Sequence, residues 1–180
     1  MRARAGTANW LATTLSGGDR RSIGRVPEVV IKVVEQPWLI SDLVEMIHHP
    51  DPVVRIRAAD ALEKLQHLIP GQISPFQTEL LNIAQDAEDP EIRWHLAQML
   101  PRIPTGYMKR ARIAELLKHY AFDKSVIVRV SAMQGLADLA RADNTFRLIA
   151  VRHINSALLF GAPAEKARAK KLLSELEQGR

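Results

Sequence analysis

The sequence repeats one phrase at a fixed distance. The stretch DPVVRIRAADALEKL, from Asp51 to Leu65, returns 38 residues later as DPEIRWHLAQMLPRI, from Asp89 to Ile103. Both stretches open on Asp-Pro and keep an arginine, a small or apolar residue and a leucine in step. A chain with a period of this length folds as a stack of similar supersecondary units, because each unit needs a neighbour to cover its apolar side.

The arginine of the phrase marks the period along the chain. Arg55, Arg93, Arg129 and Lys166 follow one another at intervals of 38, 36 and 37 residues. Further apolar or small residues stand three and ten positions after each anchor. Offsets of 3, 7 and 10 fall on one side of a helix, so each phrase is predicted to be an amphipathic helix. The leucines at offset 7 are Leu62, Leu100, Leu136 and Leu173.

The starts of these helices can also be read from the sequence. An acid followed by a proline opens two of them, at Asp51 and Asp89, and an N-terminal proline is tolerated where no intrahelical bond is due. Ser125 is the predicted cap of the next helix, and Pro163 opens the last. A second apolar stripe precedes each phrase, so every unit is predicted to be a helical hairpin. The first helices of these hairpins are predicted over 38–49, 75–87, 110–122 and 144–160.

The predicted domain organisation follows from these hairpins. Residues 1–8 are expected to be frayed, and residues 9–178 are expected to form a single domain. A degenerate N-terminal cap pair covers 9–35, with helices over 10–15 and 19–35, and Pro27 kinks or delays the second of these. The repeats that follow are 36–69, 73–104, 106–141 and 143–178.

These residues resemble the HEAT repeat family, and in particular the bacterial phycobilin-lyase HEAT-like type. VVRIRAADAL, from Val53 to Leu62, is a close match to the family pattern, and the copies at Glu91 and Val126 are good ones. The resemblance implies an all-α fold, a right-handed α-solenoid of about four to five stacked hairpins. It also implies a ladder of Asp–Arg bonds between adjacent turns, although the arginines could instead contact a ligand. The ladder residues would be Asp51, Asp89, Arg55, Arg93 and Arg129.

Few residues suggest catalysis or metal binding. The chain has no cysteine, which excludes disulfides, thiolate zinc sites and thiol catalysis. Its six histidines stand at unrelated repeat positions and form no H-E-x-x-H motif. The glycine-rich stretch SGGDRR is a linker turn or, alternatively, a phosphate cradle at a helix start. We therefore predict no metal, no cofactor and no enzymatic activity.

Charge and hydropathy indicate where the protein resides and which kinds of partner it can bind. No apolar run approaches the length of a membrane helix, and the N-terminus is a poor signal peptide, so the sequence predicts a cytoplasmic protein. The net charge of +5 permits an acidic partner or nucleic acid. Basic runs lie near Arg20 and Arg21, at 107–112 and at 165–171, but few aromatic residues accompany them.

The surface predicted to bind a partner is the concave face, which the second helices line in such solenoids. Polar residues recur there two, five and nine positions after each anchor, and Trp94 stands beside them. Aromatic residues and arginines are favoured anchors of protein interfaces. The predicted partner-binding residues are Arg57, Asp60, Lys64, Trp94, His95, Gln98, Arg102 and Gln134.

The functional prediction is a monomeric, non-catalytic scaffold that binds a protein partner through this concave face. An alternative is a nucleic-acid-binding protein, with or without base-excision activity similar to that of HEAT-like DNA glycosylases. A third option, a pigment lyase or its accessory factor, rests only on the name of the family that the chain resembles.

Overall fold

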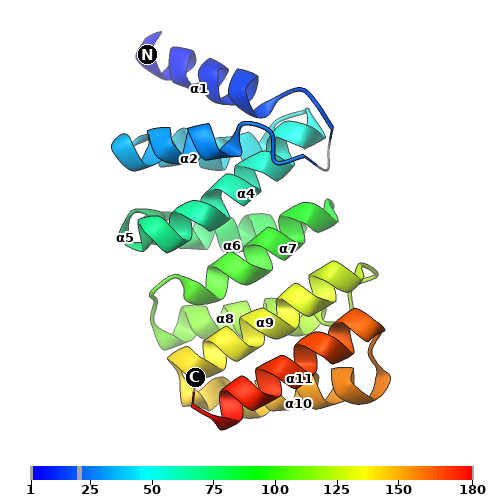
Figure 1. Ribbon diagram of the computed structural model, residues 1–180. Coiled ribbons are helices and arrows are strands. Elements are labelled where there is room, and N and C mark those ends of the chain that lie inside the picture. Colours follow the sequence, from blue (N-terminus) through cyan, green and yellow to red (C-terminus); the bar gives the residue numbers. More distant parts are fainter. Residues whose placement is uncertain (1, 20–21, 180) are drawn as a thin grey trace. The chain divides into compact units, whose positions relative to one another are not determined.

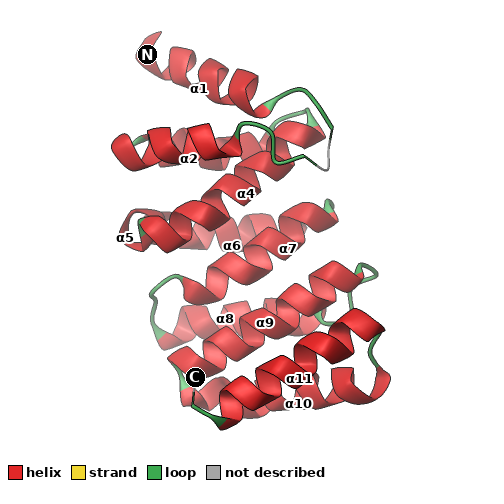
Figure 2. Cartoon of the chain, in the orientation of Figure 1, coloured by secondary structure: helices red, strands yellow, loops and turns green. Residues whose placement is uncertain are grey.

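Helices are the only regular elements among the described residues, which are 2–19 and 22–179 of this computed structural model (Figure 2). The all-α class predicted from the periodic apolar stripes is therefore confirmed. None of these helices combines the length and the hydrophobicity that a bilayer-spanning segment needs.

The chain divides into two compact units, Met1–Ile83 and Ala84–Arg180, and each is described by itself. In the first unit α1 packs against α2, α3 and α4 (Figure 1). Its elements are α1 (Arg2–Leu15), α2 (Val26–Glu35), α3 (Leu39–Glu45), a 3₁₀ turn (Met46–His48), α4 (Pro52–Leu68), α5 (Pro70–Ile73) and a 3₁₀ turn (Ser74–Phe76). Helix α6 (Gln77–Asp86) crosses the border between the units.

The N-terminal helices differ from the prediction. Helix α1 runs from Arg2 to Leu15, whereas the sequence predicted a helix over 10–15; Met1 lies outside the described residues. Leu11 and Leu15 are fully buried, and the Thr7 hydroxyl donates to Asp42 at 2.7 Å, so the helix is held against α3. Helix α2 begins at Val26 rather than at residue 19, with Pro27 in its first turn, as the predicted delay requires.

The second unit is organised around α9, which packs against α7, α8, α10 and α11. Figure 1 shows α9 between α7 and α11. Helices α8 and α9 form one hairpin, and α10 and α11 form the next. The elements are α7 (Pro90–Met99), a 3₁₀ turn (Leu100–Arg102), α8 (Tyr107–Tyr120), α9 (Val126–Ala142), a 3₁₀ turn (Asn144–Phe146), α10 (Arg147–Phe160) and α11 (Pro163–Glu177).

Most predicted helix starts are found within a residue or two. The Asp51 carboxylate accepts a hydrogen bond from the Val53 amide at 2.8 Å, and Pro163 opens α11. Ser125 stands at the N-cap of α9, but its side chain makes no capping bond. The preceding Asp123 instead accepts from the Ser125 amide at 2.7 Å, because an Asp side chain readily folds back on a turn two residues later.

The repeated leucine position is buried in three of its four copies. Leu62, Leu100 and Leu136 are 0% exposed, as expected for residues that recur because they pack. Leu173, the last copy, is only half-buried. The apolar stripe read from the sequence therefore lies in the interior for the first three copies.

Candidate functional site

Each anchor arginine fastens the turn in front of its own helix. Its Nη1 atom donates to two backbone carbonyls, five and six residues earlier in the chain, and this geometry occurs three times. Carbonyl oxygens that precede a helix have no intrahelical partner, so the guanidinium satisfies them and fixes the turn. The pairs are Arg55 with His49 and Pro50, Arg93 with Ala87 and Glu88, and Arg129 with Asp123 and Lys124.

In the second unit the same arginines also reach the next turn. Arg93 Nε lies 2.8 Å from Asp123 Oδ2, in the turn between α8 and α9. Arg129 makes a bidentate ion pair with Glu165 of α11, with Nε–Oε1 and Nη2–Oε2 distances of 2.9 and 2.8 Å. These contacts are of the kind that the resemblance implies for a ladder, although Glu165 takes the place of an aspartate.

The Arg129–Glu165 pair is fixed from both sides. The hydrogen bond from Arg129 holds the pKa of Glu165 below its ordinary value, and the same bond raises the pKa of Arg129. Glu165 also accepts a hydrogen bond from the Ala162 amide at 2.9 Å, which ties it to the start of α11. Both groups therefore remain charged over the physiological pH range.

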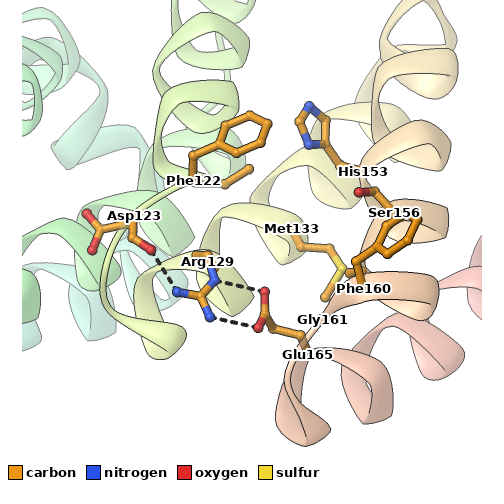
Figure 3. A pocket seen from close by; sticks show the side chains of 11 residues that line it. Phe122, Asp123, Arg129, Met133, His153, Ser156, Phe160, Gly161 and Glu165 are labelled. Carbon is orange, nitrogen blue, oxygen red and sulfur yellow. Dashed lines mark hydrogen bonds and ion pairs between the residues drawn. The ribbon is translucent and has the colours of Figure 1, made fainter.

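An open groove of about 310 Å³ lies above this ion pair, between the two hairpins (Figure 3). Figure 3 shows Phe122 and His153 at one end of the groove and the Arg129–Glu165 pair at the other. Met133 lies between them. The remaining lining comes from the two turns and from α10, namely Ala121, Asp123, Ser156, Ala157, Phe160 and Gly161.

Two phenylalanines at the edges of the groove are almost completely exposed. Phe122 is 82% exposed in the turn after α8, and Phe160 is 85% exposed at the end of α10. Hydrogen bonds hold both turns: the Phe122 amide donates to His119 O, and the Gly161 amide donates to Ala157 O. The phenyl rings therefore project from fixed backbone.

Gly161 allows the second turn to close tightly. A Cβ atom at this position would lie 2.5 Å from Ala157 O and 2.9 Å from the Glu165 Cβ. Real carbon–oxygen contacts are longer, so any side chain here would push α11 away from α10. The glycine thus determines where Phe160 and Glu165 lie relative to each other.

His153 contributes a neutral imidazole to the groove. Its ring centroid lies 6.1 Å from that of Phe122, with the ring planes at 71°. Burial lowers the pKa of His153, and the charge of Lys118 lowers it further. The histidine is therefore uncharged at neutral pH, and the groove offers apolar and aromatic contacts above a neutralised ion pair.

The carboxylate of Glu165 and the guanidinium of Arg129 use their polar atoms on each other and on the turns, so neither is placed to move a proton. A ligand can contact the exposed side chains of Phe122 and Phe160, the half-buried imidazole of His153 and the hydroxyl of the exposed Ser156.

Arg57 was predicted to be an exposed binding residue, and that expectation is wrong. Its side chain is 3% exposed, and its guanidinium donates to backbone carbonyls of the segment between α1 and α2. The acceptors are Leu15, Ser16 and Gly17 at 2.7–3.2 Å, and Asp19 and Ser22 at 3.2 and 3.1 Å. Arg57 is thus a structural residue that caps the carboxyl end of α1.

The described part of the glycine-rich region that begins with SGGDRR, residues 16–19 and 22–24, lies around the guanidinium. Gly17, Gly18 and Gly24 have positive φ angles of 74°, 74° and 52°, a region that favours glycine. A Cβ atom on Gly24 would lie 2.6 Å from the Arg57 Cζ. The carbonyls of this segment converge on a cation, which does not favour the phosphate cradle considered from the sequence. Arg20 and Arg21 lie outside the described residues.

The other predicted binding residues of the first unit are Asp60 and Lys64. They form an ion pair with each other on α4, and Asp60 is buried.

In the second unit the predicted residues lie on α7 and α9, but they bind one another. Arg102 Nε donates to Asp138 Oδ2 at 2.8 Å, and Gln134 Nε2 donates to Asp138 Oδ1 at 2.7 Å. Gln98 Nε2 donates to Ser131 Oγ at 3.4 Å. Arg141 extends this network from Asp138 to Glu175 of α11. These polar residues therefore connect neighbouring helices.

Trp94 and His95 lie side by side on α7, with ring centroids 4.9 Å apart and the planes at 70°. His95 is buried and Trp94 is half-buried, so neither is freely exposed as the concave face required. Within the part of the chain that the structure describes, the Trp94 indole nitrogen is buried and has no hydrogen-bond acceptor.

The remaining ladder residues are Asp51, Asp89 and Arg55. Asp51 caps α4, as described above. Asp89 is the N-cap residue of α7, but its side chain makes no capping bond to that helix.

Sequence reasoning missed Phe122, Phe160 and His153. The signal was present, because Phe122 stands where the earlier hairpins have His49 and Asp86. His153 likewise replaces the leucines Leu80 and Leu116 of the repeat. The groove residues could have been found by looking for positions where one hairpin differs in residue type from the equivalent positions of the other hairpins.

No family model matches the chain, and neither a curated protein nor a solved structure was found that matches it.

Proposed function

We propose that the chain is a HEAT-like helical-repeat protein whose hairpins stack as a right-handed α-solenoid and serve as a non-catalytic binding scaffold. Support comes from the three arginine–turn contacts at the repeat period and from the buried leucines Leu62, Leu100 and Leu136. Identical contacts at a fixed period are what stacked units require.

We further propose that the scaffold binds a protein segment in the groove between Phe122 and Phe160. The observation that carries this proposal is the exposure of the two phenyl rings, 82% and 85%, at the edges of an open groove. Covering one such side chain contributes roughly 1.5–3 kcal/mol, and a chain with fixed aromatic anchors loses little side-chain entropy on binding. The partner segment would insert an aliphatic or aromatic side chain between the rings.

The concave face predicted from the sequence remains a second candidate surface for the same function. Arg102, Gln98 and Gln134 carry it in the second unit, but their bonds to Asp138 and Ser131 would have to be replaced by bonds to the partner. Replacing Arg57 would test folding rather than binding, because this side chain is buried.

Selection from a random peptide display library tests the groove. We expect the selected peptides to carry apolar side chains and to bind the Phe122→Ala/Phe160→Ala variant at least about tenfold more weakly than the wild type. Met108→Ala is the matched control, since Met108 is exposed on α8 but does not line the groove.

Two results would contradict the proposal. Equal peptide affinities for the wild type and the double variant would exclude the groove. Retention of labelled DNA or RNA that falls steeply with salt, without selected peptides, would favour the nucleic-acid alternative.

A further inference from the structure

Helix α11 has one side that no helix of its own unit covers. Arg141 of α9 binds Glu175 at 2.6 Å, so the side of α11 with Glu175 faces α9. The residues Lys166, Lys170, Leu173 and Glu177 are spaced by three or four positions, and their strip lies about half a turn around the helix from Glu175. Leu173 is half-buried there, and the three charged residues are exposed.

Helix α10 contributes apolar residues to the same side of the hairpin. His153 faces Phe122 in the preceding hairpin, with ring centroids 6.1 Å apart. Val151 and Leu158 lie roughly opposite His153 around the helix and are half-buried. The hairpin therefore has an outer side, formed by Val151, Leu158 and Leu173 and flanked by Lys166, Lys170 and Glu177.

The residues at the equivalent positions of the preceding hairpin and of the 3₁₀ turn after α7 are buried. The counterparts of Leu173 in the same unit are Leu100 and Leu136, and both are 0% exposed. The counterpart of Val151 in α8 is Ala114, which is 1% exposed. An apolar surface that the residues of its own unit leave partly uncovered favours association.

The charges on the strip are self-complementary. If a second α11 lies antiparallel on a two-fold axis at Leu173, the two Leu173 side chains meet, and Lys170 of each copy faces Glu177 of the other. Neither Lys170 nor Glu177 has an ion-pair partner among the residues that the structure describes. A two-fold interface uses the same patch on both copies, so each favourable contact occurs twice.

We propose that two copies of the chain associate through this outer side, with α11 packed antiparallel on α11 of the other copy. Burial of the apolar residues supplies most of the binding free energy. The Lys170–Glu177 pairs determine how the two helices are aligned, since exposed ion pairs contribute more to orientation than to binding free energy.

Cysteine cross-linking tests the register directly, because the chain has no cysteine of its own. Leu173→Cys places one thiol at the proposed axis, where the two Cα atoms lie close enough for a disulfide. Mild oxidation should convert this variant into a covalent dimer, visible on a non-reducing gel. Ser174→Cys is the control, because Ser174 is exposed on a different side of α11 and its thiol should remain unlinked.

Sedimentation equilibrium supplies the second measurement. Wild-type protein should form dimers with increasing concentration, Lys170→Glu should raise the dissociation constant several-fold, and Lys170→Glu/Glu177→Lys should restore it. Phe122→Ala/Phe160→Ala should dimerise like the wild type, which separates this proposal from the peptide groove. A monomer at all concentrations, as the sequence analysis predicts, or equal cross-linking of both cysteine variants would overturn it.

Discussion

At the scale of single residues, the position of an arginine in the chain decides its role. Arg55, Arg93 and Arg129 lie in the first turns of their helices and donate to the carbonyls of the turns before them. Arg57, two residues after the first anchor, points to another side of α4, and its guanidinium donates hydrogen bonds to carbonyls at the end of α1. Side chains 200° apart on one helix thus fasten two different segments.

Removing the buried guanidinium should destabilise the N-terminal unit. We expect Arg57→Met to lower the free energy of unfolding by roughly 2–4 kcal/mol, because the buried Leu15 carbonyl and four part-buried carbonyls lose their donor. The measurement is urea unfolding followed by circular dichroism. Arg25→Met serves as the control, since Arg25 is exposed and makes an exposed ion pair with Glu28, and it should change stability little. Equal stability of the two variants would contradict the structural role of Arg57.

The Arg129–Glu165 pair should make stability depend on pH. The pKa of Glu165 is lowered in the folded chain, first by the hydrogen bond from Arg129, so its contribution is present above the unfolded pKa. That contribution is lost as the pH falls through the folded pKa. The difference in urea midpoint between wild type and Glu165→Gln should therefore shrink from neutral pH to about pH 3. A difference that stays constant over this range would argue against the pair.

At the scale of elements, α9 is the helix on which the second unit depends. It contacts α7, α8, α10 and α11, and Figure 1 shows it between α7 and α11. Close approach to α7 occurs at Gly135. A Cβ atom there would lie 2.5 Å from Ala97 O and 3.0 Å from Leu117 Cδ1. The glycine therefore sets the distance between α7 and α9.

Substituting this glycine tests the close approach. Alanine is the better helix former by up to about 1 kcal/mol, so Gly135→Ala would stabilise an isolated helix. In the folded chain we expect net destabilisation of roughly 1–3 kcal/mol, because α7 and α9 must move apart. Thermal unfolding of Gly135→Ala should be compared with Gly71→Ala, where nothing lies within 4 Å of the added atom. A Gly135→Ala variant as stable as Gly71→Ala would show that the helices separate at no cost.

At the scale of the whole molecule, the second unit contains hydrogen bonds and ion pairs that connect its own helices. The Tyr120 hydroxyl donates to Ala84 O, and burial raises the pKa of Tyr120 well above its ordinary value. Ion pairs connect α7 to the turn before α9, and α9 to α11. The unit thus has its own core and its own polar network.

A chain that begins at Gln77, the first residue of α6, should therefore fold without the preceding residues. We expect the fragment 77–180 to have a helical circular dichroism spectrum and one cooperative urea transition. Leu136→Ala should destabilise the fragment by roughly 2–5 kcal/mol, as a buried leucine requires. A fragment without a cooperative transition would show that its core depends on residues 1–76.

Much of the helical framework could be predicted from the sequence. The starts at Pro52 and Pro163 and the burial of Leu62, Leu100 and Leu136 follow from local capping and from helical periodicity. The error at α1 has the same origin: an Arg/Ala-rich segment has no strong apolar stripe, and its order depends on contacts with α3 and α4.

The candidate site was less predictable. Offsets from the anchor identified polar positions on the second helices, but not which of these side chains find partners inside the chain. Arg102 and Gln134 both converge on Asp138, and Arg57 turns inward. Whether a polar side chain is exposed depends on which side chains of the neighbouring repeat it meets, as Arg102 meets Asp138, and the spacing of residues along one helix does not show this.

The sequence by itself determined the helices, their order and the side of each that is apolar, because these depend on interactions between residues three or four apart. Only the tertiary structure decided which charges neutralise one another and which apolar residues remain outside. Those outcomes depend on the approach of neighbouring hairpins. Phe122, Phe160 and Leu173 are apolar residues of the kind found in protein cores. Only the packing of the hairpins shows that the side chains of Phe122 and Phe160 are exposed and that Leu173 is half-buried.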